Sequence, residues 1–151
     1  MIYLAAPLFN PRELTFNLEL AERLEQVDEV FLPQRDGSLL VNMLAAGVPR
    51  EVAQRRVFAQ DLEAMRGATM LVAVLDGAHI DEGVAFEIGF SNALGKVCVG
   101  FQTDVRRALP SGNNPMIERA LGSISADVGE LIDRVRAIID AGRGGHAMSI
   151  R

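Results

Sequence analysis

A single carboxylate stands in the middle of an otherwise apolar stretch of the chain. Glu87 lies in DEGVAFEIGFSNALG, residues 81–95, whose composition is typical of a buried helix. An ionised carboxylate among apolar side chains is costly unless it has partners, so Glu87 needs a specific reason to be there. Asp81 and Glu82 stand at the expected helix start, where free N–H groups and the helix dipole favour negative charge. A reactive carboxylate is one explanation for Glu87, and a structural ion pair or a solvent-facing position is the other.

The segments around Glu87 predict where further reactive groups lie. An apolar run ends at Asp76 directly before the acidic helix, and this arrangement places carboxylates at the carboxyl end of a sheet. Tyr3 lies in the first apolar run, and Asp61 interrupts the helical segment FAQDLEAM. Paired carboxylates with a Tyr suit glycosyl chemistry: one attacks or stabilises an oxocarbenium-like carbon, and another handles the proton of the leaving group. Acids at a sheet edge also cap helices and bind magnesium, so the residue types alone leave these roles open.

Strand-like and helix-like segments alternate along the whole chain. The expected strands are 1–6, 29–32, 69–75 and 97–101, with a brief fifth one around Ile124. The expected helices are 11–26, 50–66, 81–94, 115–121 and 127–141, with an irregular or helical piece at 39–46 and a polar loop that starts at Pro33. Because the strands are short and apolar on both faces, we expect an α/β protein with a doubly wound, flavodoxin-like, five-stranded parallel sheet and helices on both faces. Residues 1–141 form one expected domain, and 142–151 a flexible tail.

The composition narrows the classes of partner. A net charge of −5 over 151 residues, with no basic run, argues against nucleic acid and membrane surfaces as partners. No apolar run is long enough to span a membrane and no signal segment is visible, so a cytoplasmic protein is expected. Cys98 is the single cysteine, and its apolar neighbours favour a small buried side chain. His79 and His146 lack partners at ligand spacing and the glycine fingerprints for phosphate are missing, so neither a metal nor a cofactor is expected.

Four stretches together resemble the nucleoside 2-deoxyribosyltransferase family, which includes the related deoxynucleotide N-hydrolases. They are IYLAAPLFN at the start, QDLEAM around Asp61, DEGVAFEIG at 81–89 and NPM at 114–116. The acidic run after a strand is fairly specific, and its combination with Asp61, 26 positions before Glu87, is more so. The resemblance runs from Ile2 to about Met116, most of the chain.

The resemblance implies an enzyme that transfers 2-deoxyribose between nucleobases, with some hydrolysis. In such an enzyme Glu87 is the nucleophile that bonds to C1′ of the sugar, and Tyr3 hydrogen-bonds to it. Asp61 and Asp81 handle the base proton and bind the sugar or base. The substrates are deoxynucleosides and free nucleobases, and the protein is a homo-oligomer with shared active sites. The other expected substrate contacts are Phe9 beside the base, Gln34 and Asp36 where base-reading residues are expected, and Asn114 and Met116, which reach into the neighbouring subunit's site.

Two other functions are compatible with the sequence. A hydrolase of deoxynucleoside 5′-monophosphates would need phosphate-binding Ser, Gly or Arg groups near the 5′ end of the sugar, and the loop AAPLFN offers none. This family often has Gly where Ala5 stands, which implies a tighter approach to the sugar. A non-enzymatic, receiver-like domain would use the acids of the same sheet edge to bind magnesium. Gln34 and Asp36 would serve equally well as solvated loop residues.

Overall fold

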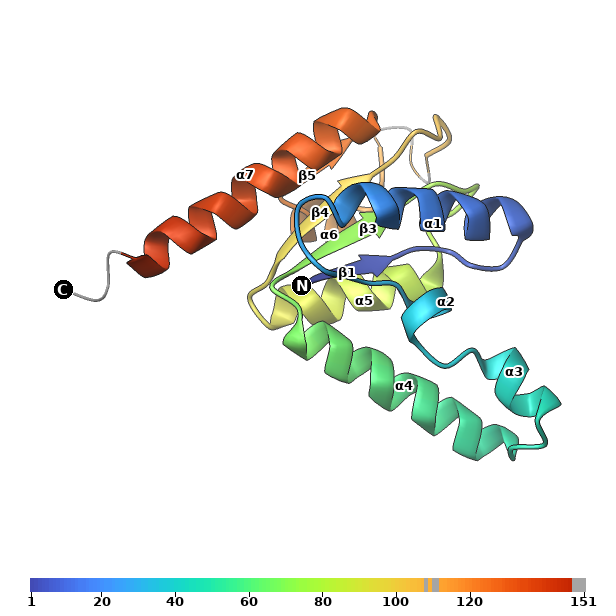
Figure 1. The fold of residues 1–151 in the computed structure, drawn as a ribbon. Coiled ribbons are helices and arrows are strands. Elements are labelled where there is room, and N and C mark those ends of the chain that lie inside the picture. The colour runs from blue at the N-terminus through green and yellow to red at the C-terminus, as the bar shows by residue number, and fades with distance from the viewer. Residues whose placement is uncertain (108, 110–111, 148–151) are drawn as a thin grey trace.

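Five parallel strands form the central sheet of the protein (Figure 1). The computed structural model describes residues 1–107, 109 and 112–147. The strand order is β2-β1-β3-β4-β5, with β1 at Ile2–Ala5, β2 at Val30–Phe31, β3 at Met70–Val74, β4 at Val97–Phe101 and β5 at Ser123–Ser125. This is the flavodoxin-like order, in which ligands bind where the order reverses, at the carboxyl ends of β1 and β3. The predicted fold class is confirmed.

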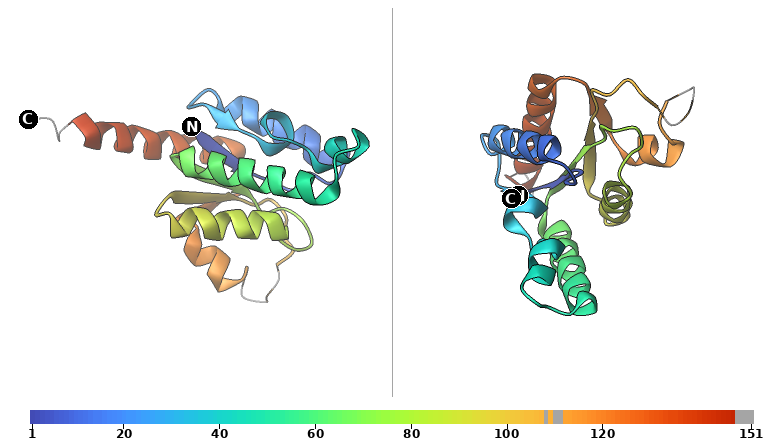
Figure 2. Two further views of the ribbon diagram at one scale, coloured as in Figure 1. Left: turned by 90° about the horizontal axis from the view of Figure 1, so that it is seen from below. Right: turned by 90° about the vertical axis from the view of Figure 1, so that its right-hand side faces the viewer.

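Helices cover both faces of this sheet (Figures 1 and 2). One face carries α1 (Pro11–Leu24) and α7 (Val128–Ala147), and the other carries α4 (Arg50–Gly67), α5 (Glu82–Ala93) and α6 (Pro115–Ala120). Two short helices, α2 (Pro33–Asp36) and α3 (Leu40–Ala45), connect β2 to α4. In Figure 1, α3 and the first half of α4 extend outward from the body of the domain. None of the helices in the described part of the chain is long and apolar enough to cross a membrane.

The side chains of the strands alternate between two hydrophobic cores. In β1, Ile2 and Leu4 point toward α1 and α7, whereas Tyr3 and Ala5 point toward α4 and α5. All residues of β3 are buried, because helices cover it from both sides. This alternation places the phenol of Tyr3, the one tyrosine of the chain, on the face that α5 covers.

Capping residues and a glycine set the ends of the two helices, α1 and α5, that start near the carboxyl edge of the sheet. Asn10 caps α1, and its Oδ1 accepts a hydrogen bond from the N–H of Glu13 at 3.1 Å. Asp81 caps α5, and its Oδ1 accepts from the N–H of Val84 at 3.0 Å. Just past the end of α5, Gly95 has a φ of 71°, a left-handed conformation that glycine adopts readily. The predicted starts of both helices and the glycine end of α5 are therefore confirmed.

The segment 33–36 is helical, although its polar composition predicts a loop. Pro33 suits a first helical turn because its missing N–H is not needed there. The side chain of Asp36 reaches back and accepts a hydrogen bond from the N–H of Leu32 at 2.8 Å. This contact holds the short helix α2 against the end of β2.

The last helix is longer than its glycines predict. Glycine lowers helix stability, so an end near Ala141 is expected, yet α7 continues to Ala147. Arg143 lies 3.7 Å from the carboxylate of Asp28, and this ion pair joins the extended end of α7 to the body of the domain. The expected flexible tail is thus helical as far as Ala147, and its last part, 148–151, lies outside the described residues.

Candidate active site

The side chain of Glu87 is hydrogen-bonded to Tyr3, which lies on β1. The hydroxyl of Tyr3 donates a hydrogen bond to Oε1 of Glu87 at 2.6 Å. Tyr3 is fully buried and stacks on Phe31, with ring centroids 5.6 Å apart. Burial and the nearby charge of Glu87 raise the pKa of Tyr3 far above its usual value, so its phenol stays protonated and donates. The hydrogen bond therefore orients the Glu87 carboxylate.

The surroundings of Glu87 disfavour a negative charge. Burial raises the pKa of Glu87 to about 8, and the charges of Asp61 and Asp81 add to this, whereas the Tyr3 hydrogen bond opposes it. Burial also raises the pKa of Asp61 to about 6. With these pKa values the two carboxyl groups hold one proton between them at neutral pH, and it resides mainly on Glu87. Such a pair has the properties needed for a nucleophile and a general acid–base.

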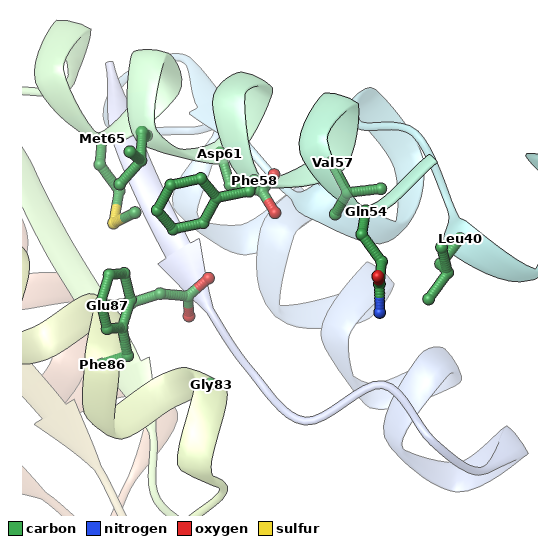
Figure 3. Close-up of a pocket in the computed structure, with 10 residues that line it drawn as sticks. Leu40, Gln54, Val57, Phe58, Asp61, Met65, Gly83, Phe86 and Glu87 are labelled. Carbon is green, nitrogen blue, oxygen red and sulfur yellow. The ribbon is translucent and has the colours of Figure 1, made fainter. Parts of the chain in front are cut away.

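A pocket of about 330 Å³ lies between α4 and α5, a volume in the range of small-molecule sites (Figure 3). Figure 3 shows the carboxylates of Asp61 and Glu87 facing this space from the two helices. Gln54 adds a third polar side chain, and the rest of the lining is apolar. The residues that line the pocket are Leu40, Gln54, Val57, Phe58, Asp61, Leu62, Met65, Gly83, Phe86 and Glu87. The structure thus brings Tyr3, Asp61 and Glu87 together, whereas Asp81 lies near enough for its charge to act on Glu87 but caps α5 and does not line the pocket.

Two of the expected base contacts have their polar atoms bonded to the protein itself. Gln34 donates from Nε2 to the carbonyl oxygen of Leu14 at 2.8 Å, and its Oε1 accepts from Nδ2 of Asn17 at 2.9 Å. Asp36 accepts two hydrogen bonds from the guanidinium of Arg35, each at 2.9 Å. Neither residue belongs to the lining of the pocket between α4 and α5.

Three further expected contacts lie on the surface. Phe9 is 75% exposed and Met116 is 79% exposed. Asn114 is exposed at the start of α6, and its Oδ1 accepts a hydrogen bond from the N–H of Met116 at 2.9 Å. Figure 2 shows α6 on the side of α5 that faces away from α4. Within one chain, α5 therefore separates Asn114 and Met116 from the pocket.

Comparison with known families identifies the family of the chain. The family model for nucleoside 2-deoxyribosyltransferases matches residues 2–138 of the chain. The chain belongs to the nucleoside 2-deoxyribosyltransferase family. The predicted family is confirmed, and the match extends past α6 into α7. A search of the curated proteins gives no significant match.

Solved structures support the same assignment. A conserved protein from Enterococcus faecalis V583 is 25% identical with a TM-score of 0.70, and the alignment covers 90% of this chain and 96% of that one. The 2-deoxyribosyltransferase from Bacillus psychrosaccharolyticus is 26% identical with a TM-score of 0.67, over 87% of this chain and 89% of that one. The corresponding figures for a 2-deoxyribosyltransferase from Leishmania mexicana are 25% and 0.50, over 70% and 66%. The predicted enzyme class, a nucleoside deoxyribosyltransferase, is confirmed.

Gln54 and Phe58 line the pocket but lie outside the motifs that carry the family resemblance, whereas Phe86 lies inside the stretch 81–89 and had no predicted role. Gln54 and Phe58 are on α4, seven and three positions before Asp61, and Phe86 directly precedes Glu87 on α5. Residues three, four and seven positions apart share one face of a helix. Gln54 and Phe58 could therefore have been predicted to share the helix face of Asp61. Their residue types alone do not indicate a function.

Proposed function

We propose that this enzyme transfers 2-deoxyribose between nucleobases through a covalent intermediate on Glu87. The observation that carries the proposal is the 2.6 Å hydrogen bond from Tyr3, which orients a carboxylate at the wall of the pocket. A second acid, Asp61, faces the same space from the opposite helix. A nucleophile and a proton donor on facing walls are what cleavage of an N-glycosidic bond requires.

The first half of the reaction cleaves the donor nucleoside. A carboxylate oxygen of Glu87 bonds to C1′ while the bond from C1′ to the base nitrogen breaks, and Asp61 gives its proton to the departing base. The pKa values of the free protein place the shared proton mainly on Glu87, so this proton must pass to Asp61 as the donor nucleoside binds, before Glu87 attacks. Burial, which raises the pKa of Asp61 to about 6, makes that carboxyl a competent acid near neutral pH.

The second half reverses these steps with a new acceptor. The incoming base attacks C1′, gives its N–H proton to Asp61 and releases the Glu87 carboxylate. Each half inverts the configuration at C1′, so the product keeps that of the donor. Water in place of the base gives free deoxyribose, so slow hydrolysis accompanies transfer. The apolar lining of the pocket limits this loss because it disfavours ordered water beside the intermediate.

An exchange assay tests the proposal directly. The enzyme is incubated with deoxyinosine and adenine, and separately with thymidine and adenine, and the products are separated by chromatography. The proposal predicts deoxyadenosine in at least one mixture, with slow release of free base when adenine is left out. Release of base and deoxyribose with no exchanged nucleoside in either mixture would identify a hydrolase instead.

We also propose that the active site is completed by a second copy of the chain. Asn114 and Met116 are exposed on the side of α5 away from the pocket, so a neighbouring chain can receive them more readily than their own pocket can. The pocket itself is open on one side, and a transferase gains from a wall that keeps water out. A symmetric dimer is the commonest arrangement in which two chains exchange such contacts.

Mixing two inactive variants tests the sharing of sites. Glu87→Ala removes the nucleophile and Asn114→Ala removes the proposed contact from the neighbour. After subunit exchange, a mixed dimer carries one site with both residues intact, so part of the exchange activity returns. Each variant mixed with itself is the control. Full activity of Asn114→Ala alone, or no recovery despite demonstrated subunit exchange, would show that each chain builds its own site.

A further inference from the structure

The pocket contains one polar side chain that the chemistry of glycosyl transfer does not use. Glu87 and Asp61 supply the nucleophile and the proton, and Gln54 is the third polar residue of the lining. A neutral amide neither attacks a carbon nor transfers a proton near neutral pH. It does carry two N–H donors and a carbonyl acceptor, which are the groups that a nucleobase edge can pair with.

The position of Gln54 fits a contact with the base. Gln54 and Asp61 are seven residues apart on α4, so they share a face and lie about 10 Å apart along the helix. Figure 3 shows Glu87 and Asp61 toward one end of the pocket and the Gln54 amide pointing into the space toward the other end, near Leu40. A nucleoside with C1′ at Glu87 and its base directed along α4 would bring the far edge of the base to Gln54.

The end of the pocket that holds the two acids is aromatic, and Val57 lies between Asp61 and Gln54 (Figure 3). Phe58 is 55% exposed and Phe86 is 51% exposed, and their ring centroids are 6.1 Å apart. Both line the pocket, Phe58 beside Asp61 on α4 and Phe86 beside Glu87 on α5. These rings and Val57 offer apolar surfaces against which any nucleoside can pack, so they supply affinity with little selectivity. Selection among bases then depends on a polar group, and Gln54 is the one placed to provide it.

We propose that Gln54 reads the hydrogen-bonding edge of the nucleobase and so sets the base preference of this enzyme. The inference rests on the proposed function, because it takes Glu87 as the position of C1′. The other glutamine with a predicted base contact, Gln34, has its amide bonded to Asn17 and Leu14, whereas the Gln54 amide faces the pocket. The orientation of the Gln54 amide decides whether it presents its N–H donors or its carbonyl oxygen to the base, so Gln54 favours either carbonyl or amino bases.

A competition assay with two variants tests this role. One donor nucleoside is offered an equimolar mixture of adenine, hypoxanthine, cytosine and thymine, and the ratios of the nucleoside products are measured. Gln54→Glu keeps the size but presents only acceptors when ionised, so it should favour adenine and cytosine, which carry amino groups, by about tenfold or more. Gln54→Leu should reduce the discrimination between amino and carbonyl bases. Gln60→Leu is the matched control, because Gln60 is on the same helix, lies outside the lining and should leave the ratios unchanged.

A binding measurement separates failure of this inference from failure of the proposed function. Dissociation constants for deoxycytidine and deoxyuridine, which differ in one amino or carbonyl group, are measured in Glu87→Gln with and without Gln54→Leu. A changed ratio of the two constants supports base reading even if the wild type exchanges no bases. Unchanged ratios in both assays, or an equal loss for every base, would overturn the inference and place the Gln54 amide on the sugar or in a structural role.

Discussion

Two pairs of acids near the carboxyl edge of the sheet have opposite surroundings. Glu87 and Asp61 face an apolar pocket, and burial raises the pKa of Glu87 to about 8 and that of Asp61 to about 6. Asp76 and Asp104 follow β3 and β4, and their carboxylates are satisfied by the protein. Asp76 accepts hydrogen bonds from the N–H of Thr103 at 2.6 Å and from the N–H of Asp104 at 2.7 Å.

The second pair shows what a structural acid looks like in this fold. Asp76 also accepts a hydrogen bond from the hydroxyl of Thr103 at 2.6 Å, so one side chain ties together the loops after β3 and β4. The guanidinium of Arg106 holds the pKa of Asp104 well below its usual range. Residue type and position at the sheet edge therefore do not decide the role of an acid. The decisive difference is whether donors in the protein stabilise its charge or burial opposes that charge.

The largest expected effect separates two glutamates of the same helix. Glu87→Gln should lower the rate of base exchange by about four orders of magnitude, because an amide cannot form the glycosyl bond. Glu82→Gln, at an exposed position in the first turn of α5, should leave the rate within about twofold of the wild type. Exchange rates measured by chromatography check both values. Comparable losses in the two variants would mean that the helix, rather than the Glu87 carboxylate, supports activity.

The next effect contrasts an acid of each pair. Asp61→Asn should lower kcat by about 10²–10⁴, because the departing base loses its proton donor. A donor with a good leaving group, such as a nitrophenyl deoxyriboside, should recover much of this loss since it needs little protonation. Asp104→Asn should change kcat by less than about twofold, because Asp104 is outside the pocket. Steady-state kinetics of Asp61→Asn with both donors test this prediction. An equal loss of kcat with the nucleoside and with the nitrophenyl donor would show that Asp61 binds the substrate and does not donate the proton.

Substitution of Asp76 should lower the stability of the protein and leave its catalytic rate unchanged. Asp76→Ala removes acceptors for two backbone N–H groups and one hydroxyl, which should lower the free energy of unfolding by about 2 kcal/mol. Activity per folded molecule should stay near that of the wild type. Urea unfolding followed by circular dichroism measures the first value, and exchange rates below the transition measure the second. An unchanged unfolding curve would contradict the structural role of Asp76.

The smallest effect concerns stability against pH. The pKa of Glu87 is raised in the folded state to about 8 from an ordinary value of 4.5, so between these values the folded protein holds more protons than the unfolded chain. Its contribution to stability is therefore present at low pH and is lost as pH rises through this window. Glu87→Gln removes the dependence and should be more stable than the wild type at pH 8, with little difference near pH 4.5. A constant difference across the range would show that Glu87 is not buried as the structure has it.

The sequence was informative wherever local chemistry determines position. The alternation of apolar runs predicts the parallel sheet, and the order of the strands brings β1 and β3 side by side. Tyr3 and Glu87 are 84 residues apart, yet they meet because α5, which follows β3, packs against the neighbouring strand β1. Asp61 is predictable from the segment FAQDLEAM, whose pattern is otherwise amphipathic and which resembles the family.

Contacts between side chains of different elements were not predictable in the same way. Gln34 follows β2, where a base contact is expected, but its amide packs into α1 and bonds to Asn17, and no periodicity shows such a pairing. Gln54 resembles any exposed residue of α4 until the opposite wall of the pocket is known. The roles of Gln34, Asp36 and Phe9 as base contacts stay predictions. The extended part of α7 carries an ion pair between Arg143 and Asp28, a contact that glycine content does not predict.

Trapping the intermediate tests the central claim most directly. The enzyme is mixed with a donor deoxynucleoside without any acceptor base, quenched rapidly in acid, and measured by intact-mass and peptide mass spectrometry. The account predicts a mass increase of one deoxyribosyl group on the peptide that contains Glu87, no increase in Glu87→Gln, and conversion of the adduct to deoxyadenosine when adenine is added before the quench. Turnover at normal rates without any adduct, or an adduct on Asp61 instead, would contradict the assignment of Glu87 as the nucleophile.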